Sequence, residues 1–459
     1  MNRPTHLLFI SLLLSAFLFV ACNKGDLQRQ PGTAFDVARS PEALQALLDN
    51  DWLFGQSPAA GILSGESFSL TDEYCNFLLP FELNLYTWQS SIYSEGETVS
   101  DWNLSYEQVT CANQVIEAIE QLSNGTAGPA YGPLLGSGRF LRAWAFWQLA
   151  QLYAQPYDSL QADSVPGIPL PVTADLNAPI TRASLQQTYQ QICTDLQQAT
   201  DLLPATIDKA HPNRPSRAAA WAMLARVYLS MRNYQQAAIA AGNCLQLYKT
   251  LTDYQQSDTT ASIPFSGNHP EIIYQSRMQE DTRFLGGLVN GNNGFINADL
   301  YSKYTPGDLR RQLFFKGVDT QAQLKGSYAG TFYPFTGLAT NEVYLTHAES
   351  LAKMGQTAAA LNDLDTLLMK RFAPGYYIPR KSNHPDTVLS WIRTEREKEL
   401  VLHGQRWTDI RRLNKEGKQI YFTRRVKGTL YTLTPNDPKY TLPIPPQAVK
   451  ENGLQQNPR

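Results

Sequence analysis

Apolar residues recur at helical spacing along most of this chain. Between Trp102 and Leu122 they fall every three or four positions, which predicts an amphipathic helix. Ser40-Pro41-Glu42 has the composition of a helix start, with a capping side chain, a proline at the first helical position and an acid in the first turn. Further helices are predicted over 184–203, 341–372 and 387–414. The chain is therefore expected to be mainly α-helical.

One helical string occurs twice. The first copy is Phe146-x2-Leu149-Ala150-x2-Tyr153, and the second is Trp221-x2-Leu224-Ala225-x2-Tyr228, with Ala237 in a following helix beyond a turn at Asn233. A weaker third copy consists of Tyr344, Ala348, Ala360 and Leu364, with Gly355 ending its first helix. Large and small residues at this spacing resemble tetratricopeptide repeats, in which two antiparallel helices interlock. The pattern predicts a helical repeat scaffold over about 102–250 and 341–414.

Two long segments lack this period. Residues 55–100 and 264–340 are rich in Gly, Asn, Ser and aromatic side chains. The prolines between 156 and 179 also interrupt the first repeat, so its partner helix is expected only at 184–203. We expect the two segments to form a loop-rich sub-domain, inserted into the repeats, that carries a ligand.

The N-terminus predicts export and lipid attachment. Leu7 to Ala21 are apolar apart from two serines, and this run is shorter than the roughly 20 residues that span a bilayer. The apolar run follows a short N-terminal segment that contains the positive charge of Arg3. This arrangement is typical of a secretory signal peptide, which we predict over residues 1–21. Phe19-Val20-Ala21-Cys22 resembles a bacterial lipoprotein box, so Cys22 would start the mature chain, 22–459, and carry a diacylglycerol and an amide-linked palmitate. An ordinary signal peptide with a chance cysteine is the alternative.

Composition narrows the possible partners. The chain has 459 residues with 39 Lys plus Arg against 41 Asp plus Glu, so it lacks the basic surface that nucleic acid requires. Charged residues make up 17%, against about 25% in an average protein, while aromatics reach 11%. This balance suits a neutral ligand. With Cys22 acylated, the other four cysteines are expected to be buried free thiols, because three of them lie in helical patterns: Cys75, Cys111, Cys193 and Cys244.

Motifs for catalysis and cofactors are absent from the sequence. It contains no phosphate-binding loop, no Gly-x-Ser-x-Gly elbow, no His-Glu-x-x-His zinc helix and no calcium loop. No catalytic residue, metal site or cofactor is therefore predicted. A pair of carboxylates for glycoside hydrolysis stays open, because such pairs have no fixed spacing in sequence.

Several blocks, in order, resemble the SusD/RagB family, the outer-membrane nutrient-binding lipoproteins of Bacteroidetes. The blocks are Trp102-Asn-Leu-Ser-Tyr106, Arg139-Phe-Leu-Arg-Ala143, Arg214-Pro-Ser-Arg217, Asp308-Leu-Arg310, Ile392-Arg-Thr-Glu-Arg-Glu-Lys-Glu-Leu400, Gly404-Gln-Arg-Trp-Thr-Asp-Ile410 and Leu442-Pro-Ile-Pro-Pro446. Together they extend almost from Cys22 to the C-terminus. His403 and Thr408 depart from the family, which usually has Glu and Phe there, and we expect this to affect local packing in the Arg-Trp helix.

The resemblance implies a single SusD-like domain over 22–459, lipid-anchored in the outer membrane and exposed at the cell surface. It implies capture of an oligomeric nutrient and a TonB-dependent, SusC-like barrel as partner, over which the protein sits as a hinged lid. The ligand would be a glycan or, alternatively, a peptide. Two other classes stay open: a surface glycoside hydrolase, and a periplasmic repeat lipoprotein that binds only proteins.

Candidate ligand-binding residues are the aromatics and amides of the non-periodic segments, since sugar rings stack on aromatic faces and their hydroxyls pair with amides. They are Tyr86, Trp88, Tyr93, Phe284, Phe295, Phe332, Tyr333 and Phe335, with Asn290, Asn292 and Asn293. Trp88 is the first choice. Any one of these rings could equally be a packing residue. The helical tryptophans are predicted to be core, namely Trp102, Trp144, Trp147, Trp221 and Trp407, whereas Trp52 and Trp391 are ambiguous.

The charged block before Leu400 has two interpretations. Its alternating Glu and Arg/Lys residues could form ion pairs at helical spacing, and Glu399 or Asp409 could pair with Arg406. A structural network is the expected role, and catalysis is the alternative.

Overall fold

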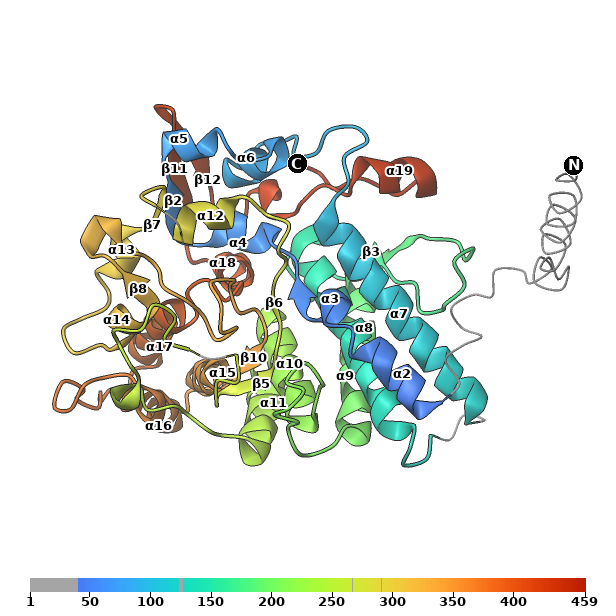
Figure 1. The fold of residues 1–459 in the computed structure, drawn as a ribbon, viewed down its shortest axis with the longest axis horizontal. Helices are drawn as coiled ribbons and strands as arrows, with labels where there is room; N and C mark the ends of the chain where they lie inside the picture. The colour runs from blue at the N-terminus through green and yellow to red at the C-terminus, as the bar shows by residue number, and fades with distance from the viewer. Residues whose placement is uncertain (1–39, 124–126, 266, 290) are drawn as a thin grey trace, which may run out of the picture.

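The computed structural model describes residues 40–459 except 124–126, 266 and 290. The signal segment, Cys22 and Asn290 therefore lie outside the described residues. The molecule is mainly α-helical, with long helices in the middle of the chain and short elements elsewhere (Figure 1). The long helices are α7 (Ser100–Leu122), α8 (Gly132–Tyr153), α9 (Leu185–Leu202), α10 (Arg217–Ser230), α11 (Tyr234–Leu247), α15 (Thr340–Lys353), α16 (Thr357–Leu368), α17 (Pro385–Glu399) and α18 (Arg406–Lys415).

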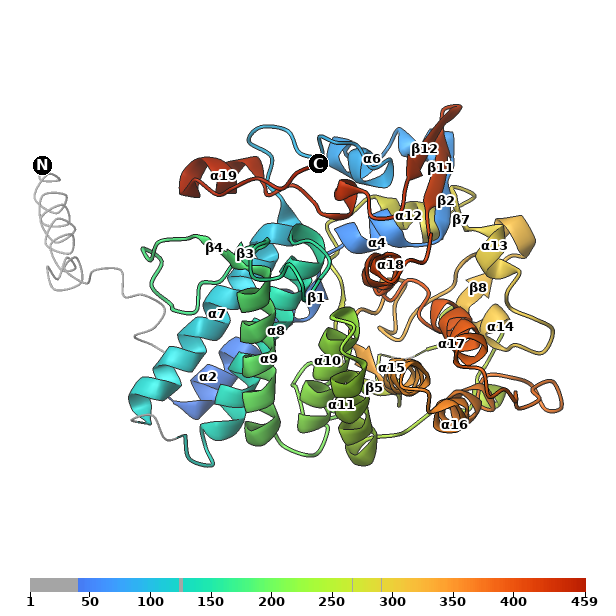
Figure 2. The same cartoon turned by 180° about the vertical axis from the view of Figure 1, so that it is seen from behind.

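The helices pack as the repeat pattern predicted. α8 pairs with α9, α10 with α11, and α15 with α16, and Figure 2 shows these pairs in succession. The small residue of each copy is buried in the core: Ala150, Ala225 and Ala348. The predicted turn signals are present, because the Asn233 side chain caps α11 and Gly355, at φ +78°, ends the first helix of the third pair. The tetratricopeptide-like fold class is confirmed.

The segment predicted to be helical over 387–414 forms two helices. α17 ends at Glu399 and α18 begins at Arg406, with Leu402 and Gly404 at positive φ between them. A left-handed residue cannot continue an α-helix. The Leu402 N–H instead donates to the carboxylate of Glu66, 3.2 Å away. His403 thus lies in a connection, where its ring packs edge-on against Tyr328 and Phe335 and not in the Arg-Trp helix.

The remaining elements are short. The helices are α2 (Pro41–Leu48), α3 (Asp51–Phe54), α4 (Ala60–Gly65), α5 (Asp72–Cys75), α6 (Pro80–Tyr86), α12 (Phe284–Val289), α13 (Ala298–Tyr301), α14 (Arg310–Phe314) and α19 (Pro446–Asn452), with 3-10 turns at Tyr254–Gln256, Asp319–Gln321 and Pro438–Tyr440. Strands pair only two by two among the described residues. The pairs are β1 (Gln56–Ser57) with β6 (Arg277–Met278), β2 (Phe68–Leu70) with β7 (Gly294–Ile296), β3 (Pro166–Pro169) with β4 (Arg182–Ser184), β5 (Ile272–Tyr274) with β10 (Leu338–Ala339), β8 (Phe315–Lys316) with β9 (Gln323–Leu324), and β11 (Phe422–Val426) with β12 (Thr429–Leu433).

Two of these pairs bring the loop-rich segments together. β1 pairs in parallel with β6, and β2 pairs antiparallel with β7, so residues 55–100 lie against residues 264–340. Both segments share one buried apolar core with the helices from α2 to α11, and a second core lies between α15, α16 and α17. Within the described part of the chain, no helix is long and apolar enough to cross a membrane.

Candidate functional site

Four of the predicted ligand-binding rings are buried, and the expectation that they face a ligand is wrong in this structure. Tyr86, Trp88, Phe284 and Phe335 all belong to the apolar core. Trp88 is only 2% exposed: its indole N–H donates to the Ser64 carbonyl at 3.0 Å, and its ring stacks on Phe422. The Arg424 guanidinium lies 4.8 Å from the Trp88 ring centre. A ring enclosed in this way has no face left for a sugar.

The other predicted residues are dispersed. Tyr93 packs on the core with its hydroxyl buried, and burial raises the pKa of Tyr93 above its usual value. Phe295 is half-buried in β7 opposite Ser69 of β2, and Asn292 is exposed in the turn before β7. These residues are not brought into one site with Trp88.

Two further predicted rings, Phe332 and Tyr333, reach the surface together with the ring of Trp52, close to where β1 pairs with β6. Trp52 in α3 is 71% exposed and Phe332 is 42% exposed. Tyr333 is half-buried, with its ring 4.7 Å from that of Phe332. We call the side chains of Trp52, Arg277, Phe332 and Tyr333 the Trp52 surface.

Arg277 joins the segments that form the Trp52 surface. Its guanidinium lies 2.9 Å from the Asp51 carboxylate, next to Trp52, and 3.2 Å from that of Glu280. The following residue, Met278, donates its N–H to the Pro334 carbonyl, next to Tyr333. Burial would lower the pKa of Arg277, but these two carboxylates raise it. The guanidinium therefore stays charged and is held against Asp51 of α3, while the backbone of residues 277–278 pairs with the 332–335 segment.

This arrangement suits a neutral, hydroxyl-rich ligand. Exposed ring faces can stack on the CH faces of a sugar, and the ion-paired Arg277, Asp51 and Glu280 groups can hydrogen-bond to its hydroxyls. Sequence reasoning included Phe332 and Tyr333 but left Trp52 ambiguous. No signal in the sequence separated Trp52 from the buried tryptophans, because its neighbour Phe54 in the same short helix is buried.

A separate hollow of about 520 Å³ lies between α7, the 169–183 segment and α19. Its aromatic wall consists of Trp102, which is buried, and Tyr106, which is half-buried, with their ring centres 4.8 Å apart. The rest of the lining is largely aliphatic side chains and prolines, such as Val172, Leu176 and Pro179. Since the rings of Trp52 and Phe332 are exposed, whereas those lining this hollow are buried or half-buried, we place the candidate ligand site at the Trp52 surface.

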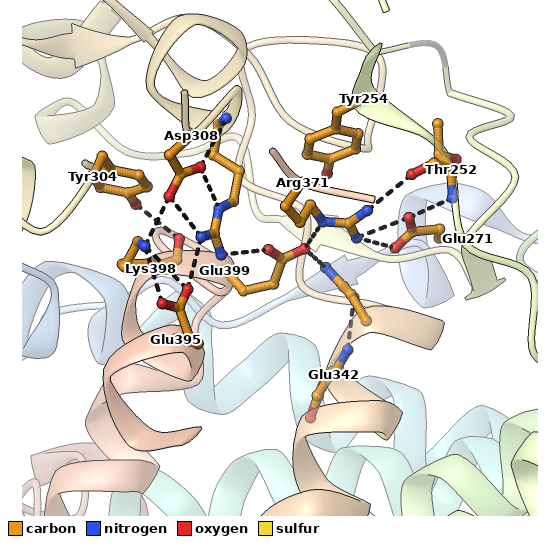
Figure 3. A network of polar contacts seen from close by, with 12 residues as sticks. Thr252, Tyr254, Glu271, Tyr304, Asp308, Glu342, Arg371, Glu395, Lys398 and Glu399 are labelled. Atoms are coloured by element: carbon orange, nitrogen blue, oxygen red, sulfur yellow. Dashed lines mark hydrogen bonds and ion pairs between the residues drawn. The ribbon is translucent and has the colours of Figure 1, made fainter. Parts of the chain in front are cut away.

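The charged block of α17 forms a buried ion network (Figure 3). The Glu399 carboxylate lies between Arg310 at 3.0 Å and Arg371 at 2.8 Å. Arg310 also pairs with Asp308 and Glu395, and Arg371 with Glu271. All six side chains are shielded from solvent, so a substrate cannot reach these carboxylates.

The predicted partners within that block need correction. Arg406 pairs with Glu397, not with Glu399 or Asp409, whereas Asp409 pairs with Arg396 and Arg412. Burial would raise the pKa of Glu399, but the guanidinium groups of Arg371 and Arg310 hold it below its usual value. The network ties segments around 271, 310 and 371 to the end of α17. Its role in this structure is to join the loop-rich part to the helices.

The described residues contain no cluster of three His, Cys, Asp or Glu side chains that could hold a metal ion. The four cysteines in this part of the chain are free thiols, and Cys75 and Cys244 are fully buried. Of the helical tryptophans predicted to be core, Trp102, Trp144, Trp147 and Trp407 are buried, while Trp221 is half-buried.

The fold defines a class: tetratricopeptide-like helical proteins with an inserted loop-rich part. A family model described as starch-binding, associating with outer membrane, matches residues 64–229, and the SusD family model matches residues 247–459. Together these matches cover most of the chain, which belongs to the SusD/RagB family.

Individual relatives agree with this assignment. SusD-like protein P2 of Formosa agariphila is 24% identical over 433 residues, covering 79% of this chain and 80% of that protein. A crystal structure of a SusD superfamily protein from Bacteroides thetaiotaomicron superposes with a TM-score of 0.74 at 19% identity, over 92% of this chain and all of that one. A structure described as a laminarin-binding SusD-like protein gives a TM-score of 0.61 at 18% identity, over 91% of this chain and 98% of the other.

Proposed function

We propose that this protein is a lipid-anchored outer-membrane protein that binds an oligosaccharide at the Trp52 surface and delivers it to a TonB-dependent barrel, over which it acts as a hinged lid. The observation that carries the proposal is the exposure of Trp52 and Phe332 beside the ion-paired Arg277. Single exposed apolar residues are common on protein surfaces, whereas exposed rings grouped beside polar groups are typical of interaction sites.

A glycan is the ligand class that the chemistry favours. Flat exposed rings beside fixed hydrogen-bonding groups match the alternating CH faces and hydroxyls of a sugar. The starch-binding description of the matching family model and the laminarin-binding relative of the same fold support this choice. A peptide ligand would rely on backbone-like hydrogen bonds, whereas the strands beside this surface, β1 and β6, consist of buried residues apart from the half-buried Arg277.

The binding test is calorimetric titration of the mature chain with a panel of neutral glycans, starting with laminarin and starch, and with a peptide library. Trp52→Ala is expected to weaken glycan binding about tenfold, the loss of about 1.4 kcal/mol. Tyr421→Ala is the matched control, because Tyr421 is also largely exposed but lies before β11. Release of reducing ends would instead indicate a glycoside hydrolase, and binding of peptides alone would overturn the glycan assignment.

Anchoring and partnership need a separate test in cells. The lipoprotein box predicts that Cys22→Ser releases the protein from the membrane fraction and abolishes labelling by palmitate. Protease treatment of intact cells should degrade the wild-type protein if it is surface-exposed. The extended helical repeat face is the natural docking surface for the barrel, which should co-purify with the protein from detergent extracts. Protection from protease and absence of a barrel would favour a periplasmic assembly lipoprotein.

A further inference from the structure

We infer that the hollow between α7, the 169–183 segment and α19 is a second ligand site, which binds an aliphatic chain that ends in a carboxylate, such as a fatty acid. The carboxylate pairs with Arg182, and the chain lies along the aliphatic side chains of the 169–183 segment. The hollow shares no lining residue with the Trp52 surface, so this second site is independent of the proposed function.

The wall of the hollow opposite α19 is held in place by α7. The 169–183 segment runs from the end of β3 into β4, and Figure 2 shows it beside α7 and below α19. The side-chain amide of Asn113 in α7 donates to the Pro171 carbonyl at 2.8 Å. The Glu117 carboxylate, one turn further along α7, accepts the Ala174 N–H at 2.7 Å. A ligand that enters the hollow does not have to order this wall first, which favours binding.

Large aliphatic side chains of the same segment remain partly in water. Val172 is 43% exposed, Leu176 77% and Ile180 37%, and all three line the hollow. Scattered apolar residues are common on protein surfaces, whereas apolar residues grouped in one place are typical of a binding site. The volume of the hollow, about 520 Å³, lies within the range of about 300–1,000 Å³ that small-molecule sites have. An aliphatic ligand of that size would cover these side chains.

Arg182 is the cationic side chain of the lining, and no carboxylate of the described chain pairs with it. Its guanidinium donates to backbone carbonyls, among them those of Gly167 and Gln455, each at 2.7 Å. By contrast, the buried Arg142 of α8 pairs with Asp195 at 2.7 Å. Burial lowers the pKa of Arg182, because removal from water disfavours the charged form. A carboxylate that enters the hollow supplies a counter-charge and a strong hydrogen-bond acceptor for the guanidinium.

The aliphatic lining and the unpaired cation together define the ligand class. Asp175, the other charged residue of the lining, is exposed, and its carboxylate accepts the Asn177 N–H at 2.9 Å. It leaves Arg182 without a counter-charge. A glycan would bury hydroxyl groups against aliphatic side chains, which is unfavourable where they find no hydrogen-bonding partner. A fatty acid buries its chain in the hollow and neutralises Arg182.

The test is calorimetric titration of the mature chain carrying Cys22→Ser, so that no attached acyl group competes. The probes are hexanoate, octanoate and decanoate, with decanol and decyltrimethylammonium as neutral and cationic counterparts, all below their micelle-forming concentrations. We expect affinity to rise about fourfold for each added methylene that is buried. Decanoate should bind about tenfold more tightly than decanol, and the cationic probe should bind most weakly.

Variants locate the site. Leu176→Ser should weaken decanoate binding about tenfold and leave the melting temperature unchanged, because this side chain is mostly exposed. Leu160→Ser is the matched control, since Leu160 is 92% exposed and lies outside the lining. Arg182→Met should abolish the preference for decanoate over decanol, and Arg182→Lys should keep it. If Arg182→Met does not fold, the comparison of probes on the wild-type residue still tests the role of the charge.

Three results would overturn the second site. Equal affinity for decanoate and decanol would exclude pairing with Arg182, and unchanged binding by Leu176→Ser would exclude the hollow. Binding of aliphatic peptides at Leu176 in place of the alkyl carboxylates would exclude the ligand class. None of these results affects glycan binding at the Trp52 surface. Conversely, a protein that binds decanoate but no glycan would overturn the proposed function alone.

Discussion

The guanidinium group of Arg310 lies 3.0 Å from the carboxylate of Glu399, and neither side chain is exposed to solvent. This pair joins the start of α14 to the end of α17, and the same carboxylate also neutralises Arg371. Removing one member of a buried pair leaves an uncompensated charge. The network is therefore expected to be the most sensitive polar feature of the fold.

Glu399→Gln should lower the free energy of unfolding by about 3–5 kcal/mol, because Arg310 and Arg371 would both lose a counter-charge. Guanidinium chloride denaturation followed by circular dichroism measures the change. Glu120→Gln is the control: its pair with Arg139 is half exposed and should contribute about 1 kcal/mol or less. Equal effects of the two substitutions would contradict the structural role of the network.

Trp88→Ala should act on stability, not on ligand binding. The buried indole is packed against Phe422 and Arg424, so its removal should cost about 3–5 kcal/mol. Trp52→Ala, at an exposed ring, should leave the melting temperature within about 1 °C of wild type while weakening glycan binding. The reverse pattern, a stable Trp88→Ala protein that has lost its ligand, would mean that Trp88 becomes accessible when ligand binds.

The raised pKa of Glu66 predicts that the stability of the protein depends on pH. Burial raises the pKa of Glu66 to about 7, although the Leu402 N–H partly opposes this, and the unfolded value is near 4.5. A raised pKa means that the folded state holds the proton more tightly. The contribution of Glu66 to stability is thus fully present below pH 4.5 and is lost as pH rises through 7, a change of about 3 kcal/mol.

Glu66→Gln removes this titration and preserves an acceptor for the Leu402 N–H. We expect the stability of the variant relative to wild type to increase steadily from pH 4.5 to pH 8, measured by denaturation at each pH. A difference between the two proteins that does not change with pH would refute the assignment.

The four cysteines of the described chain should react slowly in the native protein. Burial raises the pKa of Cys111 to about 11 and that of Cys193 to about 12, which suppresses the reactive thiolate. Ellman's reagent at pH 8 should label the buried Cys75 and Cys244 at a rate limited by opening of the fold, and the half-buried Cys111 and Cys193 slowly because little thiolate is present. In denaturant, all four should be labelled at once. Rapid reaction of one thiol would show that its helix is more accessible than the structure indicates.

The helical part of the fold could be predicted from the local spacing of apolar residues. The pairs α8–α9, α10–α11 and α15–α16 follow from residues three or four positions apart and from stop signals such as Asn233 and Gly355. The end of α17 at Glu399 could not be predicted in this way. It depends on Glu66, more than 300 positions away, which accepts the Leu402 N–H.

The candidate site could not be predicted from local sequence either. Trp88 and Trp52 both stand in aromatic-rich sequence, yet Trp88 is enclosed by Phe422 and Arg424 of a distant hairpin while Trp52 meets no such cover. Arg277 marks the site only because its side chain pairs with Asp51 while the backbone of residues 277–278 pairs with the 332–335 segment.

The sequence alone determined the family, the helical repeats and the absence of known catalytic motifs, because these depend on neighbouring residues and on ordered blocks. Only the tertiary structure decided which aromatic rings face water, because solvent exposure is set by contacts between segments that are hundreds of residues apart.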